Sequence, residues 1–226
     1  MSGGEPDRLL RTSAGDFPLD EYRLRLAGRD WSILHTGALL TFDDEQRFFR
    51  ERRDTMPYGV VLWPAAIALA HELAARGRAL DGLTVLELGA GTGLPGILAA
   101  SYGARVVQTD RHRLALAVCR RNAERNGVAG VEHRAADWSE WTDDARYDLI
   151  VGSDILYAET THPYLRRLFA SNLANGGRVL VADPFRAMSL RLLEALDADG
   201  WTIALAKWTV GEAGAERPIG VFELTR

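Results

Sequence analysis

The chain has 226 residues, of which 47% are hydrophobic and 26% are charged, and its formal net charge is -4 at pH 7. This length and composition are typical of one well-cored globular domain, and they exclude a disordered chain. The small negative charge provides no global basic field to recruit nucleic acid, so we do not expect nucleic acid as a partner.

Two further features indicate a compartment and argue against a membrane. Cys119 is the only cysteine, so no disulfide can form within the chain, which favours a reducing, cytoplasmic location. The opening residues, MSGGEPDRLLRTSAGDFP, contain no apolar core for a secretory signal. The most apolar long stretch, residues 59–75, is interrupted by Pro64, His71 and Glu72 and is shorter than a usual bilayer span. We therefore expect no membrane partner.

The N-terminal part differs in pattern from the rest of the chain. We expect residues 1–58 to form an extension of the same globular unit as a domain at residues 59–226. Alternation in YRLRLAGRDWSILHTG, around Gly28-Arg29-Asp30, predicts a β-hairpin. The charged segment DDEQRFFRERRD follows, and its basic run at residues 47–53 is interpreted as a solvated helix face, with a contact to substrate or RNA as the alternative. The extension could serve as a lid or as a docking surface.

From residue 80 onward, apolar runs rich in Val, Ile and Leu alternate with helical patterns, which predicts β-α units on a parallel sheet. The predicted strands cover residues 83–88, 104–110, 131–137, 147–154 and 178–183, and two facing strands close the chain at 201–210 and 218–226. The predicted helices cover residues 94–103, 111–127, 162–177 and 187–200, and one more begins near Pro64. The expected fold class is α/β.

The stretch VLELGAGTGLPG allows two readings of its glycines. Gly91, Gly93 and Gly96 have the G-x-G-x-x-G spacing of a dinucleotide-binding loop. The ligand loop of a β-α fold leaves the end of the first strand, and the predicted strand ends at Leu88, so the frame that begins at Gly89 is preferred. In that frame the match of Gly96 is accidental. A tight strand-to-helix turn without a ligand is the alternative.

Acidic residues lie at or next to the ends of four predicted strands, namely Glu87, Asp110, Asp137 and Asp154. Because the carboxyl ends of parallel strands meet at one edge of the sheet, these carboxylates would surround one crevice. Such a crevice disfavours a diphosphate and favours a cationic ligand, and S-adenosylmethionine fits through its sulfonium and ammonium groups. In the alternative interpretation, Glu87 and Asp154 are incidental acids, while Asp110 and Asp137 cap the segments that follow them.

Two of these acids indicate a nucleoside. Asp110 follows Gly93 by 17 residues, a spacing that carries the chain through one helix and one strand, and its carboxylate can accept both ribose hydroxyls. Asp137 is followed by Trp138, so the acid can accept from an adenine amine while the aromatic ring covers the base.

The chain from residue 59 to the C-terminus resembles the class I, seven-β-strand S-adenosylmethionine-dependent methyltransferases. Three stretches are similar to the protein-lysine methyltransferase group called methyltransferase family 16: YGVVLWPAA with Trp63 and Pro64, the loop LELGAGTGLPGI, and SDILY, which matches the group's Asp-x-x-Tyr motif as Asp154 and Tyr157. The resemblance implies a Rossmann-like, seven-stranded, mostly parallel sheet with helices on both faces, plus the N-terminal β-hairpin.

The resemblance also implies roles for individual residues. Those expected to bind S-adenosylmethionine, with S-adenosylhomocysteine as product, are Trp63, Glu87, Gly89, Gly91, Gly93, Asp110, Asp137, Trp138 and Ser153. Asp154 is expected to face the methyl-transfer site and orient the acceptor nitrogen, and Tyr157 to line the acceptor channel; these two are the expected catalytic residues. A plain core position for Trp63 and simple packing for Tyr157 are the alternatives.

The leading hypothesis is therefore an S-adenosylmethionine-dependent N-methyltransferase that acts on a lysine side chain of a protein. A small-molecule N- or O-methyltransferase and a non-catalytic module that binds the cofactor are the alternatives. No histidine pattern has metal-ligand spacing such as H-E-x-x-H, so no metal is expected.

Overall fold

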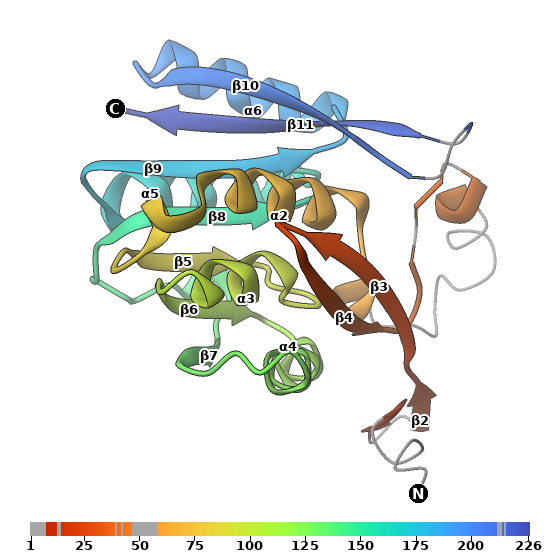
Figure 1. Cartoon of the computed structure of the whole chain (residues 1–226). Helices are drawn as coiled ribbons and strands as arrows, with labels where there is room; N and C mark the ends of the chain where they lie inside the picture. Colours follow the sequence, from red (N-terminus) through yellow and green to blue (C-terminus); the bar gives the residue numbers. More distant parts are fainter. Residues whose placement is uncertain are drawn as a thin grey trace, which may run out of the picture.

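The computed structural model describes residues 8–12, 15–38, 40–41, 43–46, 58–211, 214 and 216–226. Figure 1 shows a central sheet between two layers of helices, with the N-terminal strands packed beside it. The central strands are β5 (Thr84–Leu88), β6 (Arg105–Asp110), β7 (Val131–Ala135), β8 (Tyr147–Ser153), β9 (Leu173–Asp183), β10 (Thr202–Val210) and β11 (Arg217–Thr225). The helices are α2 (Pro64–Arg76), α3 (Leu94–Ser101), α4 (Arg113–Arg125), α5 (His162–Asn172) and α6 (Ala187–Ala198), with short 3₁₀ turns η2 (Tyr58–Val60), η3 (Gly77–Leu80), η4 (Trp138–Glu140) and η5 (Glu159–Thr161).

The seven central strands lie in the order β10-β11-β9-β8-β5-β6-β7. Neighbours from β9 to β7 are parallel, whereas β11 is antiparallel to both β9 and β10. The strand order reverses direction beside β5, because β6 lies on one side of it and β8 on the other. Ligand crevices of open α/β sheets form at such a switch point. The predicted fold class is confirmed.

Alternate residues of the central strands pack into two different cores. On β5, Val85 belongs to the cluster under α2 and α3, whereas Leu86 and Leu88 belong to the cluster under α5 and α6. Because both faces of the sheet are covered, apolar residues of this strand are buried on either side, as is usual in parallel sheets. The apolar run that predicted this strand therefore reflects burial on two sides.

Several predicted boundaries differ from the structure by one or two residues, and one pair differs by five. Residues 173–177, expected to end a helix, belong to β9, where Leu173 pairs with Tyr147 of β8. Gly177 explains the change, because a Cβ there would lie 2.9 Å from the Ala174 carbonyl oxygen, so the glycine serves a close backbone approach rather than a helix stop. Strand β7 ends at Ala135, two residues earlier than expected.

The N-terminal β-hairpin is confirmed, with β3 (Asp20–Leu26) paired to β4 (Arg29–His35). Its turn is at Ala27-Gly28, where φ is +48° and +79°, rather than at the expected Gly28-Arg29-Asp30; positive φ at both central residues matches strand twist. A smaller antiparallel pair, β1 (Leu9–Thr12) and β2 (Gly15–Pro18), precedes it and was not predicted. The basic run at residues 47–53 lies outside the described residues. Among the helices that the structure describes, none is long and apolar enough to cross a bilayer.

Candidate active site

The glycine loop leaves the carboxyl end of β5, and three of its glycines have left-handed backbones. The φ angles are +61° at Gly89, +57° at Gly91 and +80° at Gly93, where side chains other than hydrogen are strained. At Gly93, which caps α3, a Cβ would also lie 2.9 Å from the Gln108 amide nitrogen. The preferred glycine frame is therefore the one in which all three positions have a left-handed backbone that favours glycine.

Gly96 also has a structural reason, so the expectation that it matched the dinucleotide spacing by accident was wrong. A Cβ at Gly96 would lie 2.3 Å from Oε2 of Glu87, and the Gly96 N–H donates to that same oxygen at 3.1 Å. The helix can approach the strand this closely only with glycine here. The same close packing explains the third glycine of dinucleotide loops, which is why the two patterns overlap.

Glu87 lies beneath the glycine loop and is 1% exposed. Its Oε2 accepts from Gly96 and, at 2.6 Å, from the Gln108 side-chain amide, which also donates to the Gly93 carbonyl at 2.8 Å. Burial raises the pKa of Glu87 to about 8, against the effect of these hydrogen bonds. Glu87 thus ties strand, loop and helix together from below, whereas the sequence argument counted it as a negative charge facing the ligand.

Asp110 joins the end of β6 to the glycine loop. Its Oδ2 accepts from the Gly91 N–H at 3.2 Å, and its Oδ1 accepts from the His112 N–H, at the start of α4, at 2.8 Å. The residue is 7% exposed, and burial raises the pKa of its carboxyl above the usual range. Asp110 therefore lies beside the loop, as predicted, and it also bonds to the segment that follows it, as the alternative interpretation has it.

Asp137 is the N-cap of η4, because its Oδ1 accepts from the Ser139 N–H at 2.9 Å and from the Ser139 hydroxyl at 2.7 Å. These bonds lower the pKa of the exposed Asp137 carboxyl. Trp138 is partly buried and lies next to the glycine loop, since a Cβ at Gly89 would be 3.5 Å from its ring. The Trp138 ring therefore lies beside the loop and the exposed Asp137 precedes it in the chain; their contact with a nucleoside stays a prediction.

The predicted Asp-x-x-Tyr motif begins just past the end of β8. Ile155 of this motif packs on the glycine loop, because a Cβ at Gly89 would lie 2.9 Å from its side chain. Asp154 is 9% exposed and has a left-handed backbone with φ of +52°, which is uncommon outside glycine. Tyr157 is 59% exposed, and Ser153 is half-buried on the last position of β8. The motif thus packs against the glycine loop through the buried side chain of Ile155.

Arg186, which the sequence reasoning missed, holds the carboxylate of Asp154. Its Nε donates to Oδ1 of Asp154 at 2.8 Å and its Nη2 donates to Oδ2 at 2.7 Å. The same guanidinium lies 6.0 Å from the ring centroid of Trp63, which places that predicted residue beside this ion pair. No spacing in the sequence links Arg186 to Asp154; the local signal is an arginine three residues after Asp183, where β9 ends.

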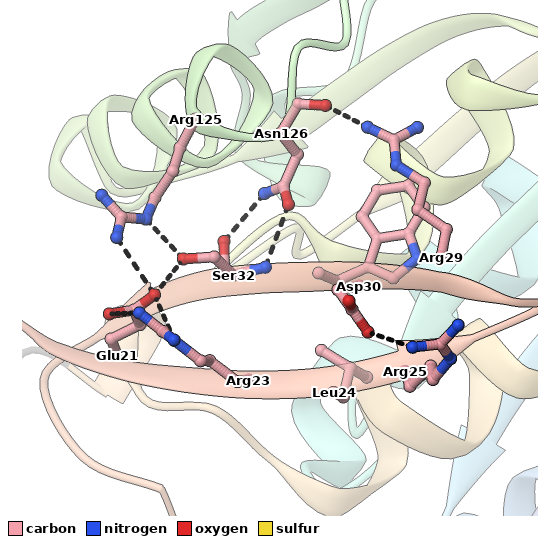
Figure 2. Close-up of a pocket in the computed structure, with 10 residues that line it drawn as sticks. Glu21, Arg23, Leu24, Arg25, Arg29, Asp30, Ser32, Arg125 and Asn126 are labelled. Atoms are coloured by element: carbon pink, nitrogen blue, oxygen red, sulfur yellow. Dashed lines mark hydrogen bonds and ion pairs between the residues drawn. The ribbon is translucent and has the colours of Figure 1, made fainter.

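A separate groove of about 750 Å³ lies between the hairpin and the end of α4, and Figure 2 shows its lining. Its residues are Glu21, Arg23, Leu24, Arg25, Arg29, Asp30, Trp31, Ser32, Arg125 and Asn126. Hydrogen bonds from Arg23 and Ser32 lower the pKa of Glu21 to about 2, and Arg125 bonds to it as well. None of the predicted site residues lines this groove, and its polar contacts attach the hairpin to α4.

Comparisons with known proteins found relatives in sequence and in fold. A family model described as lysine methyltransferase matches residues 43–190. The chain is 37% identical over 142 residues to a protein N-lysine methyltransferase of Xenopus tropicalis (METTL21A), covering 60% of this chain and 66% of that one. It is 39% identical over 106 residues to a histone-arginine methyltransferase of Mus musculus (METTL23), covering 44% and 42%. The chain thus spans less than two thirds of the length of these relatives.

Solved structures share the fold. The N-methyltransferase NodS of Bradyrhizobium japonicum, in complex with S-adenosylhomocysteine, superposes with a TM-score of 0.56 at 17% identity, covering 80% of this chain and 98% of that one. At this identity the likeness concerns the fold alone.

Proposed function

The chain belongs to the lysine methyltransferase family, as the resemblance predicted, and from this premise we propose that it transfers a methyl group from S-adenosylmethionine to a lysine side chain of a protein. The observation that carries the proposal is the contact between the glycine loop and the Asp-x-x-Tyr motif, through Gly89 and Ile155. This contact brings the expected cofactor surface next to the expected acceptor surface.

The residues around the glycine loop fit the methyl donor. The backbone at Gly89, Gly91 and Gly93 has positive φ angles and cannot accept a Cβ without strain. Glycine is the residue that allows a ligand to approach the backbone closely. Asp110 is fixed to this loop, and Asp137 stays exposed beside the ring of Trp138. When bound, S-adenosylmethionine supplies an electrophilic methyl group on a sulfonium. The proposed cofactor-binding set is Trp63, Glu87, Gly89, Gly91, Gly93, Asp110, Asp137, Trp138 and Ser153. Glu87 belongs to it by holding the loop from beneath, not by direct contact.

On the acceptor side, the main contribution of the protein to catalysis is to position the acceptor. Holding the acceptor nitrogen in line with the methyl group can contribute about 7 to 11 kcal/mol to catalysis. A lysine must also lose its proton, which at pH 7 costs about 5 kcal/mol. We assign no general base: Asp154 orients the acceptor and Tyr157 lines its approach.

We call the region of Asp154 and Tyr157, just past the end of β8, the acceptor edge. Its openness favours a macromolecular acceptor over a small molecule. Tyr157 is 59% exposed, so the side chain expected to guide the acceptor faces outward rather than into a closed apolar cavity. Lysine is favoured over arginine by the description of the family, although one relative is named a histone-arginine methyltransferase. We place the reaction in the cytoplasm on the ground of the single buried thiol, Cys119.

Methyl labelling tests this proposal. The protein is incubated with radiolabelled S-adenosylmethionine and an extract of its source cells, and protein and small-molecule fractions are separated. Label in protein, assigned to lysine by mass spectrometry, supports the proposal. Label on arginine would instead indicate an arginine methyltransferase, and label confined to small molecules would indicate a small-molecule methyltransferase. Binding of S-adenosylhomocysteine with no transfer would indicate a binding module.

A further inference from the structure

Four charged side chains of alternating sign meet at the acceptor edge. Arg186 donates to both oxygens of Asp154 and, through Nη2, to Glu45 Oε1 at 3.0 Å; Arg217 lies 2.7 Å from the other Glu45 oxygen. The order along this cluster is Asp154, Arg186, Glu45 and Arg217. We call it the acceptor-edge ion cluster. Its formal charge is zero, because two carboxylates face two guanidinium groups.

The cluster is largely withdrawn from solvent, so its charges are weakly screened. The exposed fraction of the side chain is 6% for Asp154, 8% for Glu45, 15% for Arg217 and 29% for Arg186. Buried charge pairs interact far more strongly than exposed ones. The hydrogen bond to Asp154 raises the pKa of Arg186 above its usual range, so this guanidinium is a permanent positive charge.

Arg186 is fixed at its backbone as well as at its side chain. Its N–H donates to Oδ1 of Asp183 at 2.7 Å, and the other oxygen of Asp183 accepts from the Ser189 hydroxyl at 2.5 Å. Asp183 is fully buried at the end of β9. Arg186 is therefore held by Asp183 at its backbone and by Asp154 at its side chain, on the connection between β9 and α6. It is not a loose surface side chain.

Glu45 brings the N-terminal extension into this cluster. It lies in a helical turn at residues 43–46, whose start is closed by reciprocal bonds between Thr41 and Asp44, each at 3.0 Å. Glu45 contacts Arg186 across 141 positions of sequence. The N-terminal segment thus completes the acceptor edge rather than only covering it.

We propose that Arg186, held by Glu45, is a positioning residue that neutralises Asp154 and occupies both of its oxygens, so that the acceptor edge takes an uncharged lysine amine and rejects an arginine guanidinium. The inference rests on the proposed methyl transfer to lysine. It assigns Arg186 a role in acceptor chemistry and Glu45 a role in holding Arg186, without direct contact between Glu45 and the acceptor.

The first part of the proposal follows from charge. A free carboxylate within about 4–6 Å of an amine favours the ammonium form by roughly 1–3 pKa units. The ammonium form cannot attack, because its electron pair is bound to a proton. The positive charge of Arg186 cancels this effect of Asp154. The negative charges of Asp183 and Glu45 lie on the other side of the guanidinium and partly offset its positive charge, and Arg217 in turn offsets Glu45. The acceptor then meets a nearly neutral edge.

The second part follows from hydrogen-bond geometry. A guanidinium is best held by a carboxylate that accepts two parallel N–H bonds. Nε and Nη2 of Arg186 already make this pair with Asp154. An acceptor arginine would have to displace the guanidinium of Arg186, which is also bound to Glu45. A lysine amine needs only one remaining lone pair on an Asp154 oxygen to accept its N–H.

The test compares Arg186→Gln, Arg186→Lys and the control Arg191→Gln. Arg191 is an exposed arginine on α6, the helix whose N-cap is Arg186, and it pairs with Glu159. The acceptor is a peptide around the lysine found in the labelling experiment, together with the same peptide carrying arginine. Turnover is measured from pH 6.5 to 9.5, affinity for S-adenosylhomocysteine by calorimetry, and folding by circular dichroism.

For Arg186→Gln we expect the rising limb of the pH profile to move up by about one unit, so that turnover falls about tenfold at pH 7 and recovers at high pH. Arg186→Lys should keep the limb near its original position, and the preference for lysine over arginine should narrow only in Arg186→Gln. Affinity for S-adenosylhomocysteine should stay unchanged in all three variants.

Three outcomes would overturn the inference. An equal loss of turnover at every pH would mean a merely structural role, a gain of turnover with the lysine peptide would make Arg186 a competitor for the acceptor, and an unchanged profile would give it no role. No transfer by the unmodified protein, with cofactor binding intact, would instead overturn the proposed function and this inference with it.

Discussion

The side chain of Asn122 on α4 forms a two-way amide pair with the backbone of Leu34 on β4. The Leu34 N–H donates to Oδ1 of Asn122 at 2.8 Å, and Nδ2 of Asn122 donates to the Leu34 carbonyl at 3.0 Å. Asn126, one turn later, makes the same pair with Ser32. Two asparagine side chains therefore pair with the free edge of the hairpin as a neighbouring strand would.

Asn122 should couple this hairpin to the cofactor loop, because its Nδ2 also donates to the Thr92 carbonyl at 2.9 Å. In Asn122→Ala, three buried backbone groups lose their partner, and the free energy of unfolding should fall by about 3 kcal/mol or more. Affinity for S-adenosylhomocysteine should fall too. The matched control, Asn126→Ala, loses the pairing with Ser32 and the bond from Asn126 Nδ2 to the Asn122 carbonyl, but no bond to the cofactor loop. It should be destabilised with little change in affinity. Urea denaturation and calorimetry give both quantities; equal affinities would contradict the coupling.

Gly96→Ala should disturb the packing between α3 and β5. The new Cβ would meet Oε2 of Glu87 at 2.3 Å and the Gln108 amide at 2.7 Å, and overpacking of this kind costs about 1–3 kcal/mol. Affinity for S-adenosylhomocysteine should decrease as the loop shifts. Gly37→Ala serves as control because no atom lies within 4 Å of the Cβ it adds. If both variants melt at the temperature of the parent, the packing argument is wrong.

Glu87 should make stability depend on pH. Its pKa in the folded chain is raised from 4.5 to about 8 by burial, so the folded state binds this proton more tightly than the unfolded state does. The stabilisation is therefore complete below about pH 4.5 and is lost as the pH rises toward 8. Glu87→Gln should flatten this decline. Because Asp110 shifts in the same direction, the difference between the two proteins at pH 5, 6.5 and 8 is the informative quantity; parallel stability curves would refute the assignment.

The cofactor prediction has a direct test by calorimetry. S-adenosylmethionine and S-adenosylhomocysteine should bind, whereas NAD should not. Asp110→Asn should weaken binding, because its carboxylate also bonds to the Gly91 N–H at the loop. Tight binding of NAD would show that the dinucleotide frame of the glycine loop is the functional one.

Asp154→Ala should separate binding from transfer. The substitution removes the carboxylate at the acceptor edge but leaves Arg186 bonded to Glu45, so the fold should persist. Affinity for the cofactor should remain near that of the parent, and methyl transfer should fall by about a hundredfold or more, since misplaced reactants lose that much. Transfer is measured with the labelled lysine peptide. A loss of cofactor binding would place Asp154 in the cofactor site instead.

The parts of the site that could be predicted are those whose chemistry is local. Gly89, Gly91 and Gly93 follow a strand directly, and their positive φ angles are what such a turn demands. Asp110 was placed correctly because a β-α unit has a fixed length, so its spacing from the loop has geometric meaning. Glu87 was also placed at the strand end, but its burial was not anticipated, since the alternation of facing directions depends on what covers each face of the sheet.

The sequence by itself determined the fold class, the glycine loop and the set of acids at the strand ends, because hydrophobic periodicity and turn chemistry act between neighbours along the chain. Only the tertiary structure decided what those acids touch. Asp154 meets Arg186 across 32 positions, and Asn122 meets Leu34 across 88. Such contacts depend on how distant elements pack, and no local preference of either residue encodes them. The structure thereby shows Asp154, one of the acids predicted at the strand ends, as one member of the acceptor-edge ion cluster.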